Sequence, residues 1–288
     1  MDSLTAGRCD RGMTTTAITT TTVVLGATGK TGRRVAARLR ARGLDVRPAS
    51  RSSAVRFDWT DRATWAPALD GAGAVYVSYQ PDLAVPGAPE AVAELAATAA
   101  AAGAQRLVLL SGRGEEEAQR AERAVRDAFP AATIVRGSWF AQNFSESFLA
   151  DLVRDGELAL PAGAVGEPFV DAEDIADVAA AALAEPGHAG RLYEVTGPRL
   201  LTFAQALEEI ARAGGPVARL QRIPAEAFTD ALEAAVGPAE AALVTYLFAE
   251  VLDGRNAFVA DGVQAALGRP PRDFADYARD AARSGAWG

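Results

Sequence analysis

The stretch VVLGATGKTG at residues 23–32 joins a short β-branched, apolar run to a helical pattern. Gly26 fits a tight turn after the strand, Gly29 lets the backbone approach a pyrophosphate, and Gly32 allows the helix to pack closely on the strand. The pyrophosphate would rest on the free N–H groups and the positive dipole end of the helix. The stretch therefore predicts a dinucleotide-binding loop of the Rossmann type. The predicted cofactor contacts from this loop are Gly26, Thr28, Gly29, Lys30, Thr31 and Gly32.

The loop has two other interpretations, a P-loop and a plain structural turn. Gly29-Lys30-Thr31 matches the second half of a P-loop, but that motif requires a glycine five residues before Gly29, where Val24 stands. The P-loop is therefore excluded. A plain structural turn remains the alternative to a cofactor loop.

Strand and helix patterns alternate on either side of this loop. Strands are predicted at residues 22–25, 45–49, 54–57, 74–79, 106–110 and 133–135, and helices at residues 30–42, 61–69, 90–102 and 115–128. Strands without strict alternation, separated by helices, indicate an α/β fold with a Rossmann-type doubly wound parallel sheet. After Gly137 the rhythm changes, and residues 138–288 predict a smaller α/β substrate-covering region, interwoven with a sheet domain at residues 22–137.

Composition restricts the compartment and the partners. The net charge of −8 over 288 residues argues against nucleic acid, and no apolar run is long enough for a membrane span. Cys9 is the single cysteine, which favours a reducing cytoplasm, and no metal-ligand cluster stands out. Residues 1–21 are expected to be a disordered leader, with either Met1 or Met13 as the start. The oligomeric state is open.

The end of the second predicted strand indicates which cofactor binds. NAD is usually recognised there by a carboxylate on the ribose, whereas this chain has Ser50-Arg51-Ser52. The Arg51 guanidinium can pair with the additional phosphate of NADP, and the serine hydroxyls can donate to it. NADP(H) is the predicted cofactor, with a solvated surface arginine as the alternative.

Four segments are similar to the NmrA-like branch of the atypical short-chain dehydrogenases/reductases: residues 26–32, 57–59, 135–144 and 169–176. The resemblance spans about residues 23–224. It implies that Asp58 lies near the adenine, that Ser78 and Tyr79 flank a cofactor ribose, and that Ser111 approaches the nicotinamide. It also implies a substrate pocket lined by residues 139–143. We assign two further apolar residues, Phe144 and Phe169, to the same pocket. The predicted pocket residues are Trp139, Phe140, Asn143, Phe144 and Phe169. Phe140 and Phe144 fit a hydrophobic core equally well.

The proton donor is not identified by the sequence. The superfamily's Tyr-x-x-x-Lys pair is impossible because Lys30 is the only lysine, and residues 113–122 lack the Lys or His that some NmrA-like reductases use. His188, the single histidine, is expected on the surface. The proton could come from Tyr79, from Ser111 through water, or from the acidic run at residues 115–117, which also fits the first turn of a helix.

These features predict an NADPH-dependent reductase of a carbonyl or activated double bond. The substrate expected is a small aromatic or polyketide-like molecule, as in a tailoring step of secondary metabolism. Two alternatives remain: a non-catalytic NADP(H)-sensing regulator, and a redox-neutral cyclase or isomerase on the same fold.

Overall fold

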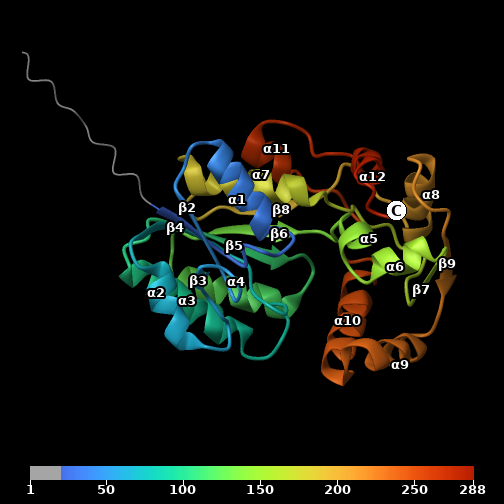
Figure 1. Ribbon diagram of the computed structural model, residues 1–288, viewed down its shortest axis with the longest axis horizontal. Coiled ribbons are helices and arrows are strands. Elements are labelled where there is room, and N and C mark those ends of the chain that lie inside the picture. The colour runs from blue at the N-terminus through green and yellow to red at the C-terminus, as the bar shows by residue number, and fades with distance from the viewer. Residues whose placement is uncertain (1–20) are drawn as a thin grey trace, which may run out of the picture.

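A seven-stranded parallel sheet organises the protein (Figure 1). The computed structural model describes residues 21–288, apart from the side chains of residues 249–251. The strand order is β3-β2-β1-β4-β5-β6-β8, and the order reverses between β1 and β4. The strands are β1 (Thr21–Leu25), β2 (Val46–Ser50), β3 (Val55–Arg56), β4 (Ala72–Val77), β5 (Arg106–Gly112), β6 (Thr133–Gly137) and β8 (Leu192–Val195). In such sheets a crevice opens at the carboxyl ends of the strands beside the reversal.

Helices cover both faces of the sheet. One face carries α1 (Gly32–Ala41), α7 (Ala172–Ala184) and α11 (Gly262–Leu267); the other carries α2 (Trp65–Leu69), preceded by the 3₁₀ turn η1 (Arg62–Thr64), α3 (Ala88–Ala101) and α4 (Glu116–Ala128) (Figure 1). Coverage on both faces explains why the strands are nearly continuous apolar runs. Val35, Ala36 and Leu39 of α1 are buried, as their helical spacing predicts.

The remaining elements form a cap beside the sheet. They are α5 (Asn143–Glu146), α6 (Leu149–Arg154), β7 (Glu157–Leu160), α8 (Phe203–Arg212), β9 (Arg219–Arg222), α9 (Ala225–Val236), α10 (Pro238–Val251) and α12 (Phe274–Arg283). Strands β7 and β9 pair in parallel. Four phenylalanines pack at the centre of the cap, with ring centroids 5.1 to 5.6 Å apart: Phe144, Phe169, Phe203 and Phe274.

The chain crosses between sheet and cap more than once. β8 and α7 come after residue 137, yet β8 pairs with β6 as the edge strand and α7 packs against α1. The predicted sheet domain at residues 22–137 therefore lacks one strand, β8, and two covering helices, α7 and α11. Asp171 caps α7 by accepting a hydrogen bond from the Glu173 amide.

The predicted doubly wound α/β fold is confirmed, and the misses are short elements. β9 was not predicted because its sequence, Arg-Leu-Gln-Arg, is mostly exposed and lacks an apolar pattern. Helix α11 has only six residues. Within residues 21–288, every helix is too short or too polar to cross a bilayer. The predicted leader lies outside the described residues except for Thr21, which begins β1.

Candidate active site

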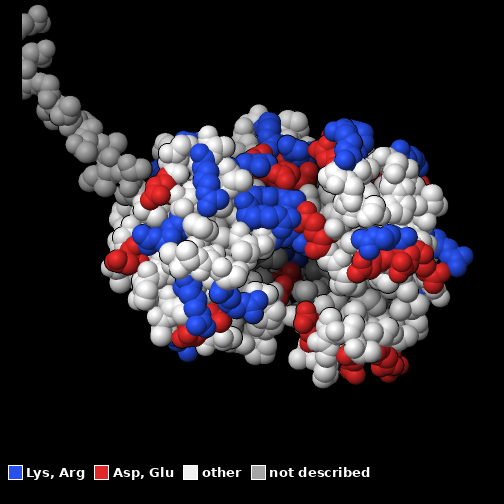
Figure 2. Space-filling view, viewed as in Figure 1, with Lys and Arg blue, Asp and Glu red and all other residues white. Residues whose placement is uncertain are grey.

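Two cavities meet along the carboxyl edge of the sheet, where Figure 2 shows the surface hollowed between sheet and cap. One, of about 670 Å³, lies beside β1 and β2; the other, of about 520 Å³, lies beside β4, β5 and the cap. Residues 78–81 line both, so the two form a continuous cleft. We call them the adenosine end and the nicotinamide end, because the cleft crosses the point where the strand order reverses.

The glycine loop forms a cradle between β1 and α1. Gly26 has a φ of +67°, and the Gly29 amide donates to its carbonyl oxygen at 2.9 Å. A Cβ on Gly32 would lie 2.2 Å from that same oxygen, so only glycine fits there. Helix α1 begins directly after this cradle, and the first-turn N–H groups of a helix are suited to binding an anion. The loop therefore fits the pyrophosphate of a dinucleotide.

Thr31 differs from its predicted role. Its side chain is buried, and its hydroxyl accepts a hydrogen bond from the Tyr76 hydroxyl at 2.9 Å. The Thr31 side chain therefore ties α1 to β4 instead of lining the cleft. Thr28, by contrast, lines the adenosine end with Gly26 and Gly29.

Turns after β2 and β3 supply the polar groups of the adenosine end. Arg51 is exposed and lines the cavity with Ser50 and Ser52. Asp58 lines it as well, and its carboxylate accepts hydrogen bonds from the amide and hydroxyl of Thr60 at 3.0 and 2.8 Å. These bonds, with smaller contributions from Arg56 and Arg51, lower the pKa of Asp58. The Asp58 carboxylate is therefore charged at neutral pH.

Aromatic side chains stand between the two ends of the cleft. The Trp59 indole N–H donates to the Ser78 carbonyl oxygen at 3.1 Å, and its ring lies 4.6 Å from the ring of Tyr79. Ser78 and Tyr79 line both cavities and therefore lie at their junction.

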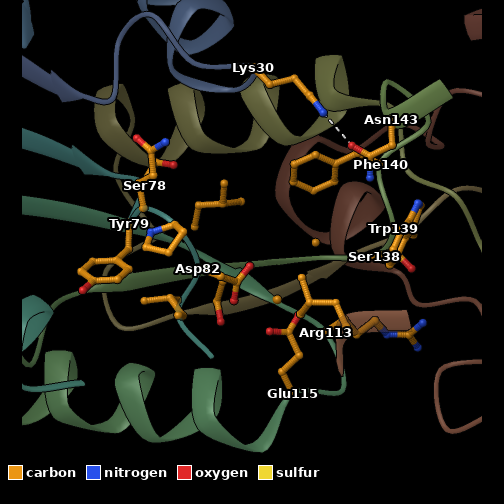
Figure 3. Close-up of a pocket in the computed structure, with 18 residues that line it drawn as sticks. Lys30, Ser78, Tyr79, Asp82, Arg113, Glu115, Ser138, Trp139, Phe140 and Asn143 are labelled. Atoms are coloured by element: carbon orange, nitrogen blue, oxygen red, sulfur yellow. Dashed lines mark hydrogen bonds between the residues drawn. The ribbon is translucent and has the colours of Figure 1, made fainter. Parts of the chain in front are cut away.

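Lys30 extends from the glycine loop towards the cap (Figure 3). Its ammonium group donates to Asn143 Oδ1 at 2.6 Å, and both residues line the nicotinamide end. Burial, together with Arg33 and Arg34, lowers the pKa of Lys30 to about 8 despite the opposing effect of Glu146. This contact joins the cofactor loop to the cap across the cleft.

The two residues predicted to donate a proton are directed elsewhere. The Ser111 hydroxyl donates to Glu122 Oε1 at 2.6 Å, and Glu122 also pairs with Arg136. Figure 3 shows the Tyr79 hydroxyl pointing away from Asp82 and the middle of the cavity. Burial raises the pKa of Tyr79, which makes it a weaker acid. Both residues line the cavity, but neither directs an acidic hydrogen into it.

A pair of carboxyl groups lies on the floor of the nicotinamide end (Figure 3). Asp82, just after β4, and Glu115, just before α4, share a hydrogen bond, and both line the cavity. Glu115 is only 6% exposed. Of the acidic run, Glu116 is exposed and Glu117 pairs with Arg120, so the structure singles out Glu115. Asp82 was missed by sequence reasoning; its position one turn beyond a strand at the sheet reversal was the available signal.

Cap residues close the nicotinamide end. Trp139, Phe140 and Asn143 line it as predicted, and Leu247 of α10 joins them. Phe144 and Phe169 do not line it: they are 0% and 3% exposed and belong to the core of the cap. Their prediction as pocket residues is corrected on this point, because aromatic spacing alone does not separate core from cavity.

The structure also bears on the predicted position of His188. This residue is buried and its Nδ1 lies 2.9 Å from the Tyr193 hydroxyl, so its predicted surface position is wrong. Among residues 21–288, His, Cys, Asp and Glu nowhere gather in a group of three or more that could hold a metal ion.

The glycine loop and the cleft across the strand reversal are typical of a protein that binds a nicotinamide dinucleotide, and comparisons with known proteins agree. A family model described as NAD(P)H-binding matches residues 26–186. A (4-alkanoyl-5-oxo-2,5-dihydrofuran-3-yl)methyl phosphate reductase of Streptomyces griseus is 32% identical, covering 91% of this chain and 98% of its own. Agroclavine dehydrogenase of Claviceps fusiformis is 30% identical over 90% and 96%. Triphenylmethane reductase of Citrobacter, crystallised with NADP(H), superposes with a TM-score of 0.72 at 18% identity, over 91% and 99%.

The chain belongs to this NAD(P)H-binding family, and the resemblance to NmrA-like atypical short-chain dehydrogenases/reductases is confirmed. It is an NAD(P)-dependent oxidoreductase. The predicted cofactor, NADP(H), is of the type that the family binds.

Proposed function

We propose that the protein is an NADPH-dependent reductase of a small, flat organic molecule with a carbonyl or an activated double bond. The observation that carries the proposal is the continuity of the cleft. The cofactor end leads directly into a cavity of about 520 Å³ that combines aromatic walls with buried polar groups. That size and lining suit a small-molecule substrate.

The choice of NADPH over NADH rests on Arg51. It stands on the turn after β2, where the adenosine ribose of a Rossmann cofactor lies, and it is exposed and free to move onto a phosphate. Asp58 lies beside it and can accept from the adenine amino group or a ribose hydroxyl. A guanidinium at this place favours the cofactor that carries the additional phosphate.

The substrate class rests on the cap and on the relatives. Trp139 and Phe140 form apolar walls, and the Trp139 indole N–H has no partner among the described residues although it is buried. A substrate oxygen would satisfy this donor. The activities of the relatives, a reductase of an oxo-dihydrofuran phosphate and a clavine dehydrogenase, support a tailoring step on a conjugated molecule.

The chain's own residues contribute binding, orientation and exclusion of water. Bound NADPH would supply a hydride to the electrophilic atom of the substrate. Trp139 and Phe140 hold the substrate face towards the sheet, while Leu247 limits access from solvent. Holding two reactants in contact is by itself a large part of such catalysis.

The test offers NADPH and a panel of acceptors to the purified protein: menadione, a 3-acyl-2(5H)-furanone and a polycyclic aromatic ketone. We expect loss of the reduced-nicotinamide absorbance with at least one of them, and reduced product by mass spectrometry. Tight NADPH binding without turnover would instead favour the regulator. Product formed without nicotinamide oxidation would favour the cyclase or isomerase.

A further inference from the structure

The Glu115 carboxyl group lies where the surrounding structure disfavours its charged form. It is 6% exposed, it lies directly over Gly112, where a Cβ would come 2.0 Å from Glu115 Oε1, and it faces Asp82. Apart from the contact of this carboxyl group with Asp82, its Oε2 has no hydrogen-bond partner within residues 21–288, although the atom is shielded from solvent. Buried polar atoms are nearly always paired, and an exception in a cavity is a site where a ligand can bind.

From this geometry we infer that Glu115, paired with Asp82, is the general acid that delivers the proton completing the reduction. The inference rests on the proposed function, since it assigns one step of that reaction. Gly112 leaves room for the carboxyl group at the end of β5, and Asp82 holds it from the loop after β4. Glu115 and Asp82 both line the cavity, so the proton that they share is the one available to the substrate.

The step balances with one proton from the protein. Hydride arrival at the electrophilic carbon moves the π electrons of a carbonyl onto its oxygen, or those of a conjugated double bond onto the neighbouring carbon or the enolate oxygen. The O–H bond of Glu115 then breaks, and its proton forms the new O–H or C–H bond. Glu115 is left as a carboxylate and regains a proton from solvent before the next turnover.

The surroundings keep Glu115 protonated at neutral pH. Burial is the largest cause; Asp82, by charge and by hydrogen bond, and Glu122 of α4 add to it, and together they raise the pKa of Glu115 to about 9. Burial also raises the pKa of Asp82. The nearby cations are engaged with other groups: Arg136 of β6 pairs with Glu122 and Glu194, and Arg113 contacts Glu194 and the ring of Phe258. A proton with a pKa near neutrality or slightly above it suits a general acid.

The decisive variant is Glu115→Gln. Glutamine has nearly the shape of the neutral acid and can still donate a hydrogen bond, but it cannot release a proton. With the panel acceptor that the wild type reduces fastest, we expect kcat to fall about 10²- to 10⁴-fold, while KM and the NADPH dissociation constant change less than about threefold. Glu116→Gln, at the exposed neighbouring position, is the matched control and should retain wild-type kcat.

The pH profile separates a proton donor from a structural carboxyl group. Wild-type kcat should decline as the pH rises through about 9, because Glu115 loses its proton there. In Asp82→Asn the charge and the hydrogen bond that disfavour ionisation are removed, so this limb should move to lower pH. A limb that stays in place in Asp82→Asn, or that persists in Glu115→Gln, would contradict the inference.

A measurement on the protein without cofactor tests the same protonation independently of activity. The folded state holds the Glu115 proton up to about pH 9, whereas the unfolded chain releases it near the ordinary pKa of about 4.3. Stability should therefore fall as the pH rises between these values, and Glu115→Gln should remove that fall. Thermal melts from pH 5 to 9 would check it; a constant difference between wild type and variant would overturn the neutral carboxyl group.

Failures of the two proposals are distinguishable. If the wild type binds NADPH and reduces no acceptor, the reductase function fails and the proton-donor role fails with it. If the wild type is active and Glu115→Gln retains its kcat, only the role of Glu115 fails. Glu115→Asp should recover part of kcat, because it restores an acid at a greater distance.

Discussion

The two ends of the cleft are built in opposite ways. At the adenosine end, Arg51 and Asp58 stand on turns beside solvent, each a few residues from the strand that positions it. At the nicotinamide end, Asp82, Glu115 and Trp139 come from three distant segments and hold polar atoms away from water. One end is suited to binding a charged ligand and the other to changing the protonation of a neutral one.

The difference reflects the free energy of desolvation. An exposed guanidinium keeps its hydration until a phosphate arrives, so little stability is lost by having it there. An unpaired carboxyl oxygen or indole N–H inside a cavity destabilises the folded state by about 1–3 kcal/mol. Such groups are therefore expected where the chemistry requires them.

We expect the largest effect from a substitution in the glycine loop, because cofactor binding at both ends of the cleft depends on this loop. In Gly32→Ala the new Cβ would lie 2.2 Å from the Gly26 carbonyl oxygen and 2.8 Å from its carbon, and neither backbone atom can move without opening the cradle. We expect NADPH affinity to fall at least about 100-fold and the free energy of unfolding to fall by about 1–3 kcal/mol. Calorimetric titration and urea denaturation would measure the two.

Gly43→Ala is the matched control for this effect. Gly43 ends α1 with a φ of +74°, and a Cβ there would meet no described atom within 4 Å. The left-handed conformation should cost about 1–2 kcal/mol of stability without any change in NADPH affinity. Equal losses of affinity in both variants would mean that the loop acts only through stability.

The second prediction sharpens the comparison, because it affects the adenosine end alone. Arg51→Ala should weaken NADPH binding about 10- to 100-fold, since a charge-assisted bond to phosphate contributes about 1.5–3 kcal/mol, and should leave NADH binding unchanged. Arg40→Ala, on the exposed side of α1, should alter neither. An equal effect of Arg51→Ala on both cofactors would remove the basis for NADPH preference.

The adenosine end was easier to predict from the sequence than the nicotinamide end. The glycine loop and Arg51 lie within a few residues of their strands, so spacing along the chain predicted them, whereas Asp58 was implied by the resemblance to the NmrA-like family. The fold was likewise predictable because the central strands β1, β4, β5 and β6 each contain an apolar run. These features are formed by residues that are close together in the chain, so a short stretch of sequence is enough to predict them.

The nicotinamide end was only partly predictable, since burial is a tertiary property. Glu115 looked the same as Glu116 and Glu117 in sequence, and only the packing of Asp82 and Gly112 separates it from them. Phe144 was indistinguishable from Phe140 until the cap placed one in its core and the other on the cavity. Contacts across distant segments leave no periodic pattern.

The smallest expected effect isolates the substrate side of the nicotinamide end. Trp139→Phe keeps most of the ring and removes the indole N–H that lacks a partner among the described residues. If a substrate oxygen accepts from this group, KM should rise about 3- to 10-fold, the value of one hydrogen bond, with NADPH affinity unchanged and stability unchanged or higher. In Trp287→Phe, the N–H lost is one that donates to the Phe144 carbonyl at 2.8 Å, so stability should fall while KM stays constant. Stability that falls in Trp139→Phe with no change in KM would place its N–H in the fold and not in the reaction.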